Sequence, residues 1–258
     1  MAESRRMKQL GGGDVVNFFD TRVVNVTLMP GGPRRYVMLF MEAGIGNLDE
    51  LGVQRSHELS LKVKLRLLVD IIRGLRRLER RGCVHRDLKP ENVLVFGNPS
   101  DPQTWRAKLA DLGFATPSEP FGCEGPSITG SANYIAPEVW LRLGHGKKSD
   151  VWSYGVLAYQ LLVGELPAPL RAAGSRGVQD QALRRVFPNR FDLRNDARFL
   201  VLMKRDPALA RFIEHLLEKQ VYRRYSVKKA LVRARALAAK RGASAPPQPE
   251  TVHPPKPL

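Results

Sequence analysis

The sequence predicts an α+β fold in which a short β-rich segment precedes a mostly helical region. Residues 15–42 combine Val- and Phe-rich runs with a Pro-Gly-Gly break at 30–32, which is typical of two strands joined by a turn. From residue 58 to 81, apolar residues recur at intervals of three and four, as they do on one face of a helix. Further helical patterns occupy 196–204, 207–219 and 226–239.

The helix predicted over 58–81 carries its apolar stripe at Leu61, Leu65, Leu68, Ile72 and Leu75. Gly82 follows directly, and glycine commonly ends a helix in a left-handed conformation. Lys and Arg fill the opposite face. We interpret that face as a solvated helix surface, with a docking patch as the alternative.

Two more strands are expected in NVLVFGN (92–98) and WRAKLADLG (105–113), joined by a Pro-, Ser- and Asp-rich turn at 97–104. An irregular stretch follows from 116 to 136, and loops of this length tend to be functional or mobile. Residues 151–164 are apolar nearly all round, which predicts a helix buried in the centre of a lobe. The tail 241–258 is proline-rich and is expected to be disordered.

The composition is globular, with 43% hydrophobic and 26% charged residues, but the net charge is +17. Such a basic surface attracts nucleic acid, anionic membranes or acidic substrates. The alternative is that the arginine-rich surface has no dedicated partner. The two cysteines, Cys83 and Cys123, predict neither a disulfide framework nor a metal cluster. Without a long apolar run or an apolar leader near Met1, we expect no membrane span and a cytoplasmic or nuclear location.

Three short motifs occur in a fixed order: HRDLKPEN at 85–92, DLG at 111–113 and APE at 136–138, with SDVWSYGV following at 149–156. In these motifs the chain resembles the catalytic domain of eukaryotic-type Ser/Thr protein kinases. The resemblance implies a bilobal α+β fold with a mostly helical large lobe and an incomplete β small lobe. Residues 1–42 would form a partial N-lobe (the end of helix C and the fourth and fifth strands), 43–240 the C-lobe, and 241–258 the tail.

The resemblance also implies ATP and Mg²⁺ as cofactors, and a role for each residue of the site. Phosphoryl transfer needs in-line positioning and neutralisation of negative charge. Asp87 would accept the proton of the substrate hydroxyl, and Lys89 would neutralise the transferring group. Asn92 and Asp111 would hold magnesium, while Leu94, under the adenine, and Glu91 would belong to the nucleotide site. A lysine two places after the aspartate indicates Ser/Thr specificity; the alternative for the whole set is an ion-pair network without catalysis.

By the same resemblance the segment before APE is regulated. Arg86 would pair with a phosphate on this segment, and such a charge-assisted contact orders a loop. Ser127 matches the commonest phosphorylated position, Thr129 is a near alternative, and a plain loop serine is the competing interpretation. Ser131 matches the hydroxyl residue that contacts the catalytic Asp and Lys.

Four further residues would have structural roles in such a domain. Glu138 would form a buried ion pair with Arg224, and Asp150 would brace the backbone of the catalytic loop. Glu3 falls where the glutamate of helix C belongs.

Two elements of the family pattern are missing from this sequence: the Gly-rich loop that covers the phosphates, and the V-A-I-K-like strand with its lysine. GGGD at 11–14 lacks the G-x-G-x-x-G spacing, and Lys8 falls on the wrong element. By analogy with an oxyanion donor, each lost phosphate contact costs roughly 10²–10³ in rate. Two strands without neighbours are also marginal in water.

The sequence therefore predicts a Ser/Thr protein kinase domain with a truncated small lobe. Three accounts compete: a partial copy of an active kinase, a kinase that works without a Gly-rich loop, and a pseudokinase-like scaffold that binds protein partners through the large lobe. A nucleic-acid-binding role ranks low, because no basic–aromatic platform occurs. The Arg-rich region 165–195 favours acidic protein substrates. No oligomeric state is predicted.

Overall fold

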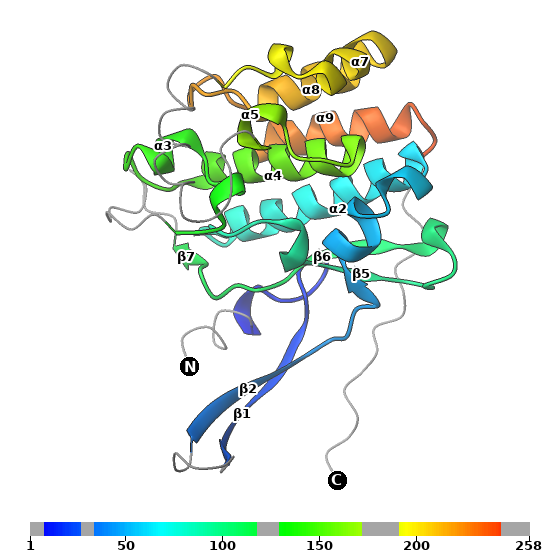
Figure 1. Ribbon diagram of the computed structural model, residues 1–258. Coiled ribbons are helices and arrows are strands. Elements are labelled where there is room, and N and C mark those ends of the chain that lie inside the picture. Colours follow the sequence, from blue (N-terminus) through cyan, green and yellow to red (C-terminus); the bar gives the residue numbers. More distant parts are fainter. Residues whose placement is uncertain (1–7, 27–33, 118–128, 172–190, 244–258) are drawn as a thin grey trace.

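The computed structural model describes residues 8–26, 34–117, 129–171 and 191–243. These residues form a helical body from which a two-stranded ribbon projects (Figure 1). Across the described ranges, no helix has both the length and the apolar character needed to cross a bilayer. Glu3, Ser127 and, from residue 244 on, the tail predicted to be disordered lie outside these ranges.

The ribbon consists of β1 (Phe18–Val26) and β2 (Arg34–Met41), which pair antiparallel with Val23 opposite Val37. The predicted pair of strands within 15–42 is confirmed. Because no third strand joins this sheet within the described residues, large apolar side chains stay exposed on it. They are Phe19, Val23, Tyr36, Val37, Met38 and Phe40.

The base of the ribbon is bound to the body by backbone hydrogen bonds and one ion pair. The N–H of Val16 donates to the carbonyl of Leu109 over 2.9 Å, and the N–H of Leu109 donates to the carbonyl of Asp14 over 3.0 Å. The Glu42 carboxylate lies 2.7 Å from Nζ of Lys108. Within the part of the chain that the structure describes, the ribbon is therefore anchored at its base alone.

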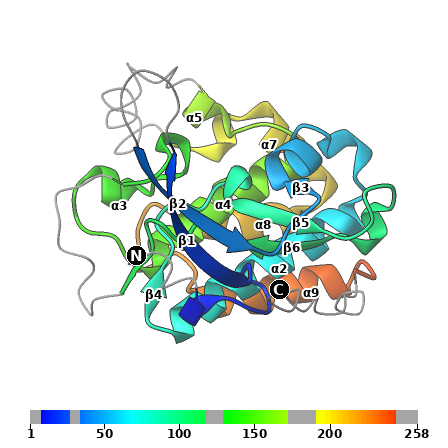
Figure 2. The same cartoon turned by 90° about the horizontal axis from the view of Figure 1, so that it is seen from below.

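Two small antiparallel sheets lie between the ribbon and the helices (Figures 1 and 2). In the first, β5 (Val93–Phe96) is flanked by β3 (Gly46–Asn47) and β6 (Arg106–Leu109). In the second, β4 (Cys83–Val84) pairs with β7 (Thr116–Pro117). The strands predicted within 92–98 and 105–113 are confirmed as β5 and β6.

The helix α2 (Leu61–Arg80) packs its apolar stripe into the core. It begins later than the predicted residue 58, because Ser60 caps it: Oγ of Ser60 accepts a hydrogen bond from the N–H of Val63. The preceding residues Ser56–Glu58 form a 3₁₀ turn instead. At the other end Gly82 has φ +69°, so it ends the helix in the left-handed conformation predicted for it.

The helix α4 (Lys147–Val163) runs through the middle of the body and is buried on nearly every side, as predicted. Its tyrosines are satisfied internally: the hydroxyl of Tyr154 donates to the carbonyl of Leu68 in α2, over 3.0 Å. That of Tyr159 donates to Asp196 over 2.8 Å. This helix carries the core that both neighbouring helical layers share.

The remaining helices are α3 (Pro137–Trp140), α5 (Ala168–Arg171), α7 (Ala197–Arg205), α8 (Pro207–Leu216) and α9 (Val227–Ala239). The last three confirm the helices predicted over 196–204, 207–219 and 226–239. Short turns complete the described residues: a π-helix at Asp49–Val53 and 3₁₀ turns at Pro90–Asn92, Pro102–Thr104, Ala132–Tyr134 and Leu193–Asn195. The predicted α+β class is therefore confirmed.

Candidate active site

The segment 85–92 forms a loop between β4 and β5, and the start of α4 holds its backbone. The carboxylate of Asp150 accepts hydrogen bonds from the N–H of His85, over 2.8 Å, and from the N–H of Arg86, over 3.0 Å. Arg86 has φ +74°, a conformation that costs free energy for a residue with a side chain. Asp150 therefore fixes a strained backbone at the point where the loop begins.

Asp87 is a buried polar residue of this loop, with 6% of its surface exposed. Its Oδ1 accepts the N–H of Ser131 over 2.7 Å, and its Oδ2 accepts the side-chain amide of Asn92 over 3.0 Å. Nζ of Lys89 lies 3.6 Å from Oδ2. The carboxylate is therefore held in one orientation, with a cation beside it. Ser131 reaches Asp87 through its backbone N–H, whereas the resemblance implied a hydroxyl contact.

Asn92 and Asp111 lie at the same edge of the sheet formed by β3, β5 and β6. The amide of Asn92 also donates to the carbonyl of Asp87, over 2.8 Å, so both contacts use its nitrogen and its oxygen is directed elsewhere. The N–H of Ala110 donates to the carbonyl of Asn92 over 2.9 Å. Asp111, the residue after Ala110, therefore lies next to the backbone of Asn92. Asp111 is exposed and has φ +52°.

These two residues supply the kind of donor that magnesium prefers. An amide oxygen and a carboxylate are hard oxygen ligands, and Mg²⁺ is commonly held by one or two such groups together with phosphate oxygens and water. No group of three His, Cys, Asp or Glu side chains able to hold a metal occurs among the described residues. The pair fits a magnesium ion that arrives with phosphates, and not a closed protein cage.

The other residues assigned to the nucleotide lie around this edge. Leu94 is partly buried in β5, opposite Asn47 of β3. Gly44 passes close to it, since a Cβ on Gly44 would come within 3.2 Å of the Leu94 side chain and 2.7 Å of the Val95 carbonyl. Glu91 is exposed in the turn before Asn92. No motif or spacing in the sequence marks Gly44 as a residue of this site.

The segment from Thr129 to Tyr134 crosses over the loop. Nη2 of Arg86 donates a hydrogen bond to Oγ1 of Thr129 over 2.9 Å. Gly130, with φ +110°, lies so close that a Cβ there would sit 2.6 Å from the Arg86 carbonyl. Only glycine permits this crossing, and no local pattern in the sequence marks Gly130 for that role. Ser127 lies outside the described residues.

The ion pair between Glu138 and Arg224 is present and buried. Nη1 and Nη2 of Arg224 donate to the Glu138 carboxylate, over 2.7 and 2.9 Å, and the hydroxyl of Ser149 donates to the same carboxylate over 2.8 Å. Burial raises the pKa of Glu138, but the hydrogen bond and charge of Arg224 outweigh it, so the pKa lies below its usual value. The guanidinium also lies over the ring of Trp152, 5.1 Å from its centroid.

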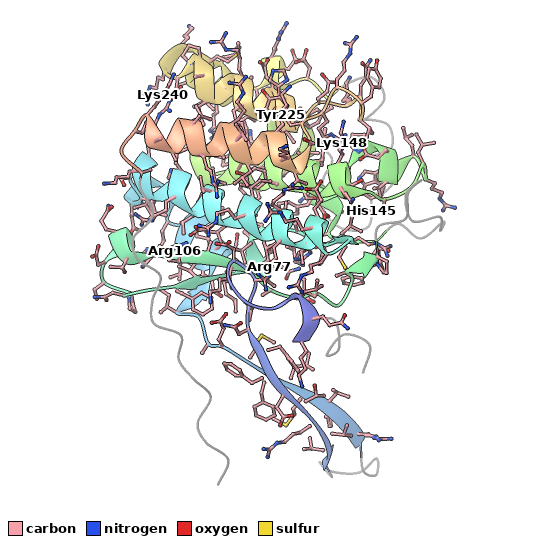
Figure 3. The ribbon with its side chains drawn as sticks, turned by 180° about the vertical axis from the view of Figure 1, so that it is seen from behind. Arg77, Arg106, His145, Lys148, Tyr225 and Lys240 are labelled. Atoms are coloured by element: carbon pink, nitrogen blue, oxygen red, sulfur yellow. The ribbon has the colours of Figure 1, made fainter. Side chains whose placement is uncertain are left out.

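Two neighbours of this ion pair were not anticipated. Nζ of Lys148 donates to the carbonyls of Val221 and Tyr222, which ties the start of α4 to the loop before α9 (Figure 3). His145 is buried close by, and burial lowers its pKa. Both lie in a segment whose sequence shows no motif, so spacing alone could not identify them.

Comparison with known proteins gives a family match that spans most of the chain. The model of the protein kinase domain matches residues 1–234. The serine/threonine-protein kinase atg1 of Dictyostelium discoideum is 31% identical over 163 residues, which are 63% of this chain and 23% of that protein. The calcium/calmodulin-dependent protein kinase cmkA of Emericella nidulans is 40% identical over 141 residues, 51% of this chain and 32% of that protein. The CBL-interacting protein kinase 17 of Oryza sativa subsp. japonica is 43% identical over 113 residues, 43% of this chain and 24% of that protein. The matched segments thus cover a third or less of these relatives.

Proposed function

The chain belongs to the protein kinase domain family, which confirms the resemblance seen in its motifs, and on this premise we propose that it transfers the γ-phosphate of ATP to serine and threonine hydroxyls of proteins. The observation that carries this proposal is the arrangement around Asp87. Its carboxylate is held by Asn92 and Ser131 and has Lys89 at 3.6 Å. These are the parts that phosphoryl transfer requires of the protein: a positioned proton acceptor and a nearby cation.

In the proposed reaction Asp87 accepts the proton of the attacking hydroxyl. Its two oxygens are already oriented by hydrogen bonds, so no reorganisation is needed when the substrate arrives. Lys89 faces the negative charge that spreads over the transferring group. The oxygen of Asn92 and the carboxylate of Asp111 would hold magnesium, which neutralises the phosphates of bound ATP. Leu94 would contribute the apolar surface under the adenine, with Glu91 at the rim.

The substrate hydroxyl belongs to a serine or threonine in this proposal, because Lys89 follows Asp87 by two positions and because the named relatives include serine/threonine-protein kinases. The preference for acidic substrates rests on the Arg-rich region 165–195, of which 172–190 lie outside the described residues. Arg171, within this region, and Arg198, three residues after it, both pair with Glu165. The preference therefore remains a prediction from sequence.

A second function is favoured by large apolar side chains exposed on the helical body, such as Leu143 and Tyr222. In that case the chain binds protein partners through the large lobe and catalyses little or no transfer.

A thermal-shift titration with Mg²⁺–ATP, followed by mapping of phosphorylated residues, separates the two functions. The kinase predicts a magnesium-dependent rise in the melting temperature, because a ligand that binds only the folded state stabilises it. It also predicts phosphate incorporation that disappears in Asp87→Asn. The scaffold predicts incorporation that Asp87→Asn does not change. ATP binding that does not depend on magnesium would also contradict the kinase function.

A further inference from the structure

A basic groove lies between α2 and α9, on the face of the body that Figure 3 shows, where Arg77 is labelled. It encloses a cavity of about 600 Å³. α2 forms one wall with residues from its second half, α9 forms the other, and Asp14 closes one end. We call this feature the α2–α9 groove. It is separate from the loop 85–92 and its residues.

The lining of the α2–α9 groove carries a large excess of positive charge. Among the described residues that line it, seven carry cationic side chains and Asp14 is the single acidic one. The cations are Arg73, Arg76, Arg77, Arg80, Arg81, Lys228 and Arg235. Leu231 and Val232 supply the apolar part of the wall. The charged face of α2, interpreted from sequence as solvated, is therefore one wall of a concave site.

Only part of this charge is neutralised inside the protein. Arg73 pairs with Asp14 at 3.2 Å, and Arg76 pairs with Glu79. Arg77 donates to the carbonyls of Leu10 and Gly11, contacts that orient its guanidinium without neutralising it. Among the described residues no carboxylate pairs with Arg80, Lys228 or Arg235. These three cations remain available to a ligand.

Helix stability explains the arginines of α2 but not the cations of α9. Positive charge near the C-terminus of α2 is favourable because it complements the helix dipole, whereas Lys228 lies in the first turn of α9, where the dipole disfavours a cation. The sequence of α9 contains no acidic residue to compensate. Cations that converge from two helices repel one another, and an anion bound between them would remove that cost.

We propose that the α2–α9 groove binds a compact soluble ligand that carries several phosphate groups. Six of the seven cations are arginines, whose forked guanidinium matches phosphate oxygens better than the ammonium of lysine does. The cations surround a cavity instead of following a line, which suits a small ligand with clustered phosphates better than a duplex or a flat membrane surface. This inference does not rest on the kinase reaction.

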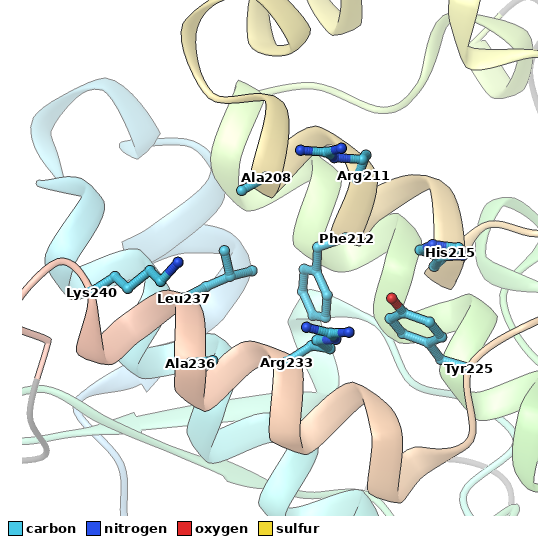
Figure 4. A pocket seen from close by; sticks show the side chains of 9 residues that line it. All are labelled: Ala208, Arg211, Phe212, His215, Tyr225, Arg233, Ala236, Leu237 and Lys240. Carbon is cyan, nitrogen blue, oxygen red and sulfur yellow. The ribbon is translucent and has the colours of Figure 1, made fainter.

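A second cavity on α9 offers an internal comparison (Figure 4). It has about 320 Å³ and lies between α8 and α9. Figure 4 shows Arg211 and Arg233 on either side of the ring of Phe212, with Lys240 beside Leu237. It has fewer cations and an aromatic and aliphatic floor, with Phe212 and Leu237. This cavity fits a polyphosphate less well, and its cations provide matched control positions.

The test measures binding of inositol hexakisphosphate to the whole chain by isothermal titration calorimetry at near-physiological salt. The groove variant combines Arg80→Gln, Lys228→Gln and Arg235→Gln, all at exposed positions. The control variant combines Arg211→Gln, Arg233→Gln and Lys240→Gln. Both remove the same net charge, so general electrostatic attraction weakens equally in the two. Circular dichroism checks that both variants are folded.

We expect one saturable site in the unmodified chain, at least about tenfold weaker binding in the groove variant, and at most about a twofold change in the control variant. Equal weakening in both variants, stronger weakening in the control, or no saturable binding overturns the proposal. Binding of phosphoinositide-containing vesicles or of a DNA duplex without binding of inositol hexakisphosphate also overturns it. Asp87→Asn is expected to leave this binding unchanged, so failure of the proposed kinase function would be recognised separately.

Discussion

Arg86 and Thr129 are joined by a hydrogen bond of 2.9 Å, while Nε of the same guanidinium is buried without a partner in the described part of the chain. A buried donor without a partner is uncommon and costs free energy. A phosphate near Thr129 would accept from both nitrogens at once. This geometry connects the loop 85–92 with the segment that the sequence predicts to be phosphorylated.

The first prediction therefore concerns Arg86. We expect phosphorylation of Thr129 or Ser127 to raise the transfer rate about tenfold or more in the unmodified chain, because a charge-assisted contact would order the crossing segment. Arg86→Gln should abolish this gain and affect the unphosphorylated chain little. Rates of both chains before and after phosphorylation by an added kinase provide the measurement. An equal gain in Arg86→Gln would contradict the assignment.

The second prediction concerns Asp87. Replacing it with asparagine removes the proton acceptor but keeps the size of the side chain, so we expect the rate to fall by about 10²–10⁴. The melting temperature should change by no more than a few degrees. Asp101→Asn, in the exposed β5–β6 turn, is the matched control and should keep the rate. A rate retained in Asp87→Asn would support the scaffold function.

The third prediction concerns Asp111. Because its φ is +52°, asparagine is the better substitution, since it tolerates this conformation where alanine is strained. Asp111→Asn should remove the magnesium-dependent part of the thermal shift by ATP. The stability of the free chain should change by less than about 0.5 kcal/mol, because Asp111 is exposed. A full magnesium-dependent shift in the variant would place the metal elsewhere.

Local sequence signals were sufficient for most of the fold, because they report interactions between near neighbours. The periodic leucines of α2, its end at Gly82 and the apolar run of α4 all appear in the structure as predicted. The exact start of α2 differed, since it depends on the Ser60 cap, which outweighs the pattern around Glu58. The two strands of the ribbon were predictable from their Val-rich sequences.

The candidate site was predictable only where a motif covers it. The residues of 85–92 lie together, and Asp150 reaches them from a distant helix. Gly130 and Gly44 were missed because their importance comes from close approach to another segment, which no local pattern records. The buried ion pair of Arg106, which Figure 3 labels, with Asp70 at 2.8 Å was missed for the same reason.

The fourth prediction concerns the buried pair of Glu138 and Arg224. Glu138→Gln leaves the guanidinium buried without its counter-charge, so we expect the free energy of unfolding to fall by about 3–5 kcal/mol. Urea denaturation measures this change. Glu50→Gln, at an exposed position, should cost less than about 0.5 kcal/mol. A similar loss in both variants would show that the pair contributes nothing specific.

The same pair predicts a pH dependence. The pKa of Glu138 is lower in the folded chain than its usual value of 4.5, so its contribution to stability is complete above that value. It is lost as the pH falls through the folded-state pKa. Stability measured between pH 6 and 3 should therefore decline less steeply in Glu138→Gln than in the unmodified chain. If stability fell with pH at the same slope in both chains, titration of Glu138 would not be the cause of the acid sensitivity.

The fifth prediction concerns the ribbon β1–β2, which is anchored only at its base and exposes apolar side chains. A two-stranded ribbon without a covering layer is marginally stable, so its amides should exchange with solvent at least about a hundredfold faster than those of α4. Val37→Lys and Met38→Lys, at exposed positions, should lower aggregation and change the global free energy of unfolding by less than about 0.5 kcal/mol. Hydrogen exchange followed by mass spectrometry and light scattering provide the measurements. Protection of the ribbon equal to that of α4 would mean that another layer, from a second copy or a partner, covers it in solution.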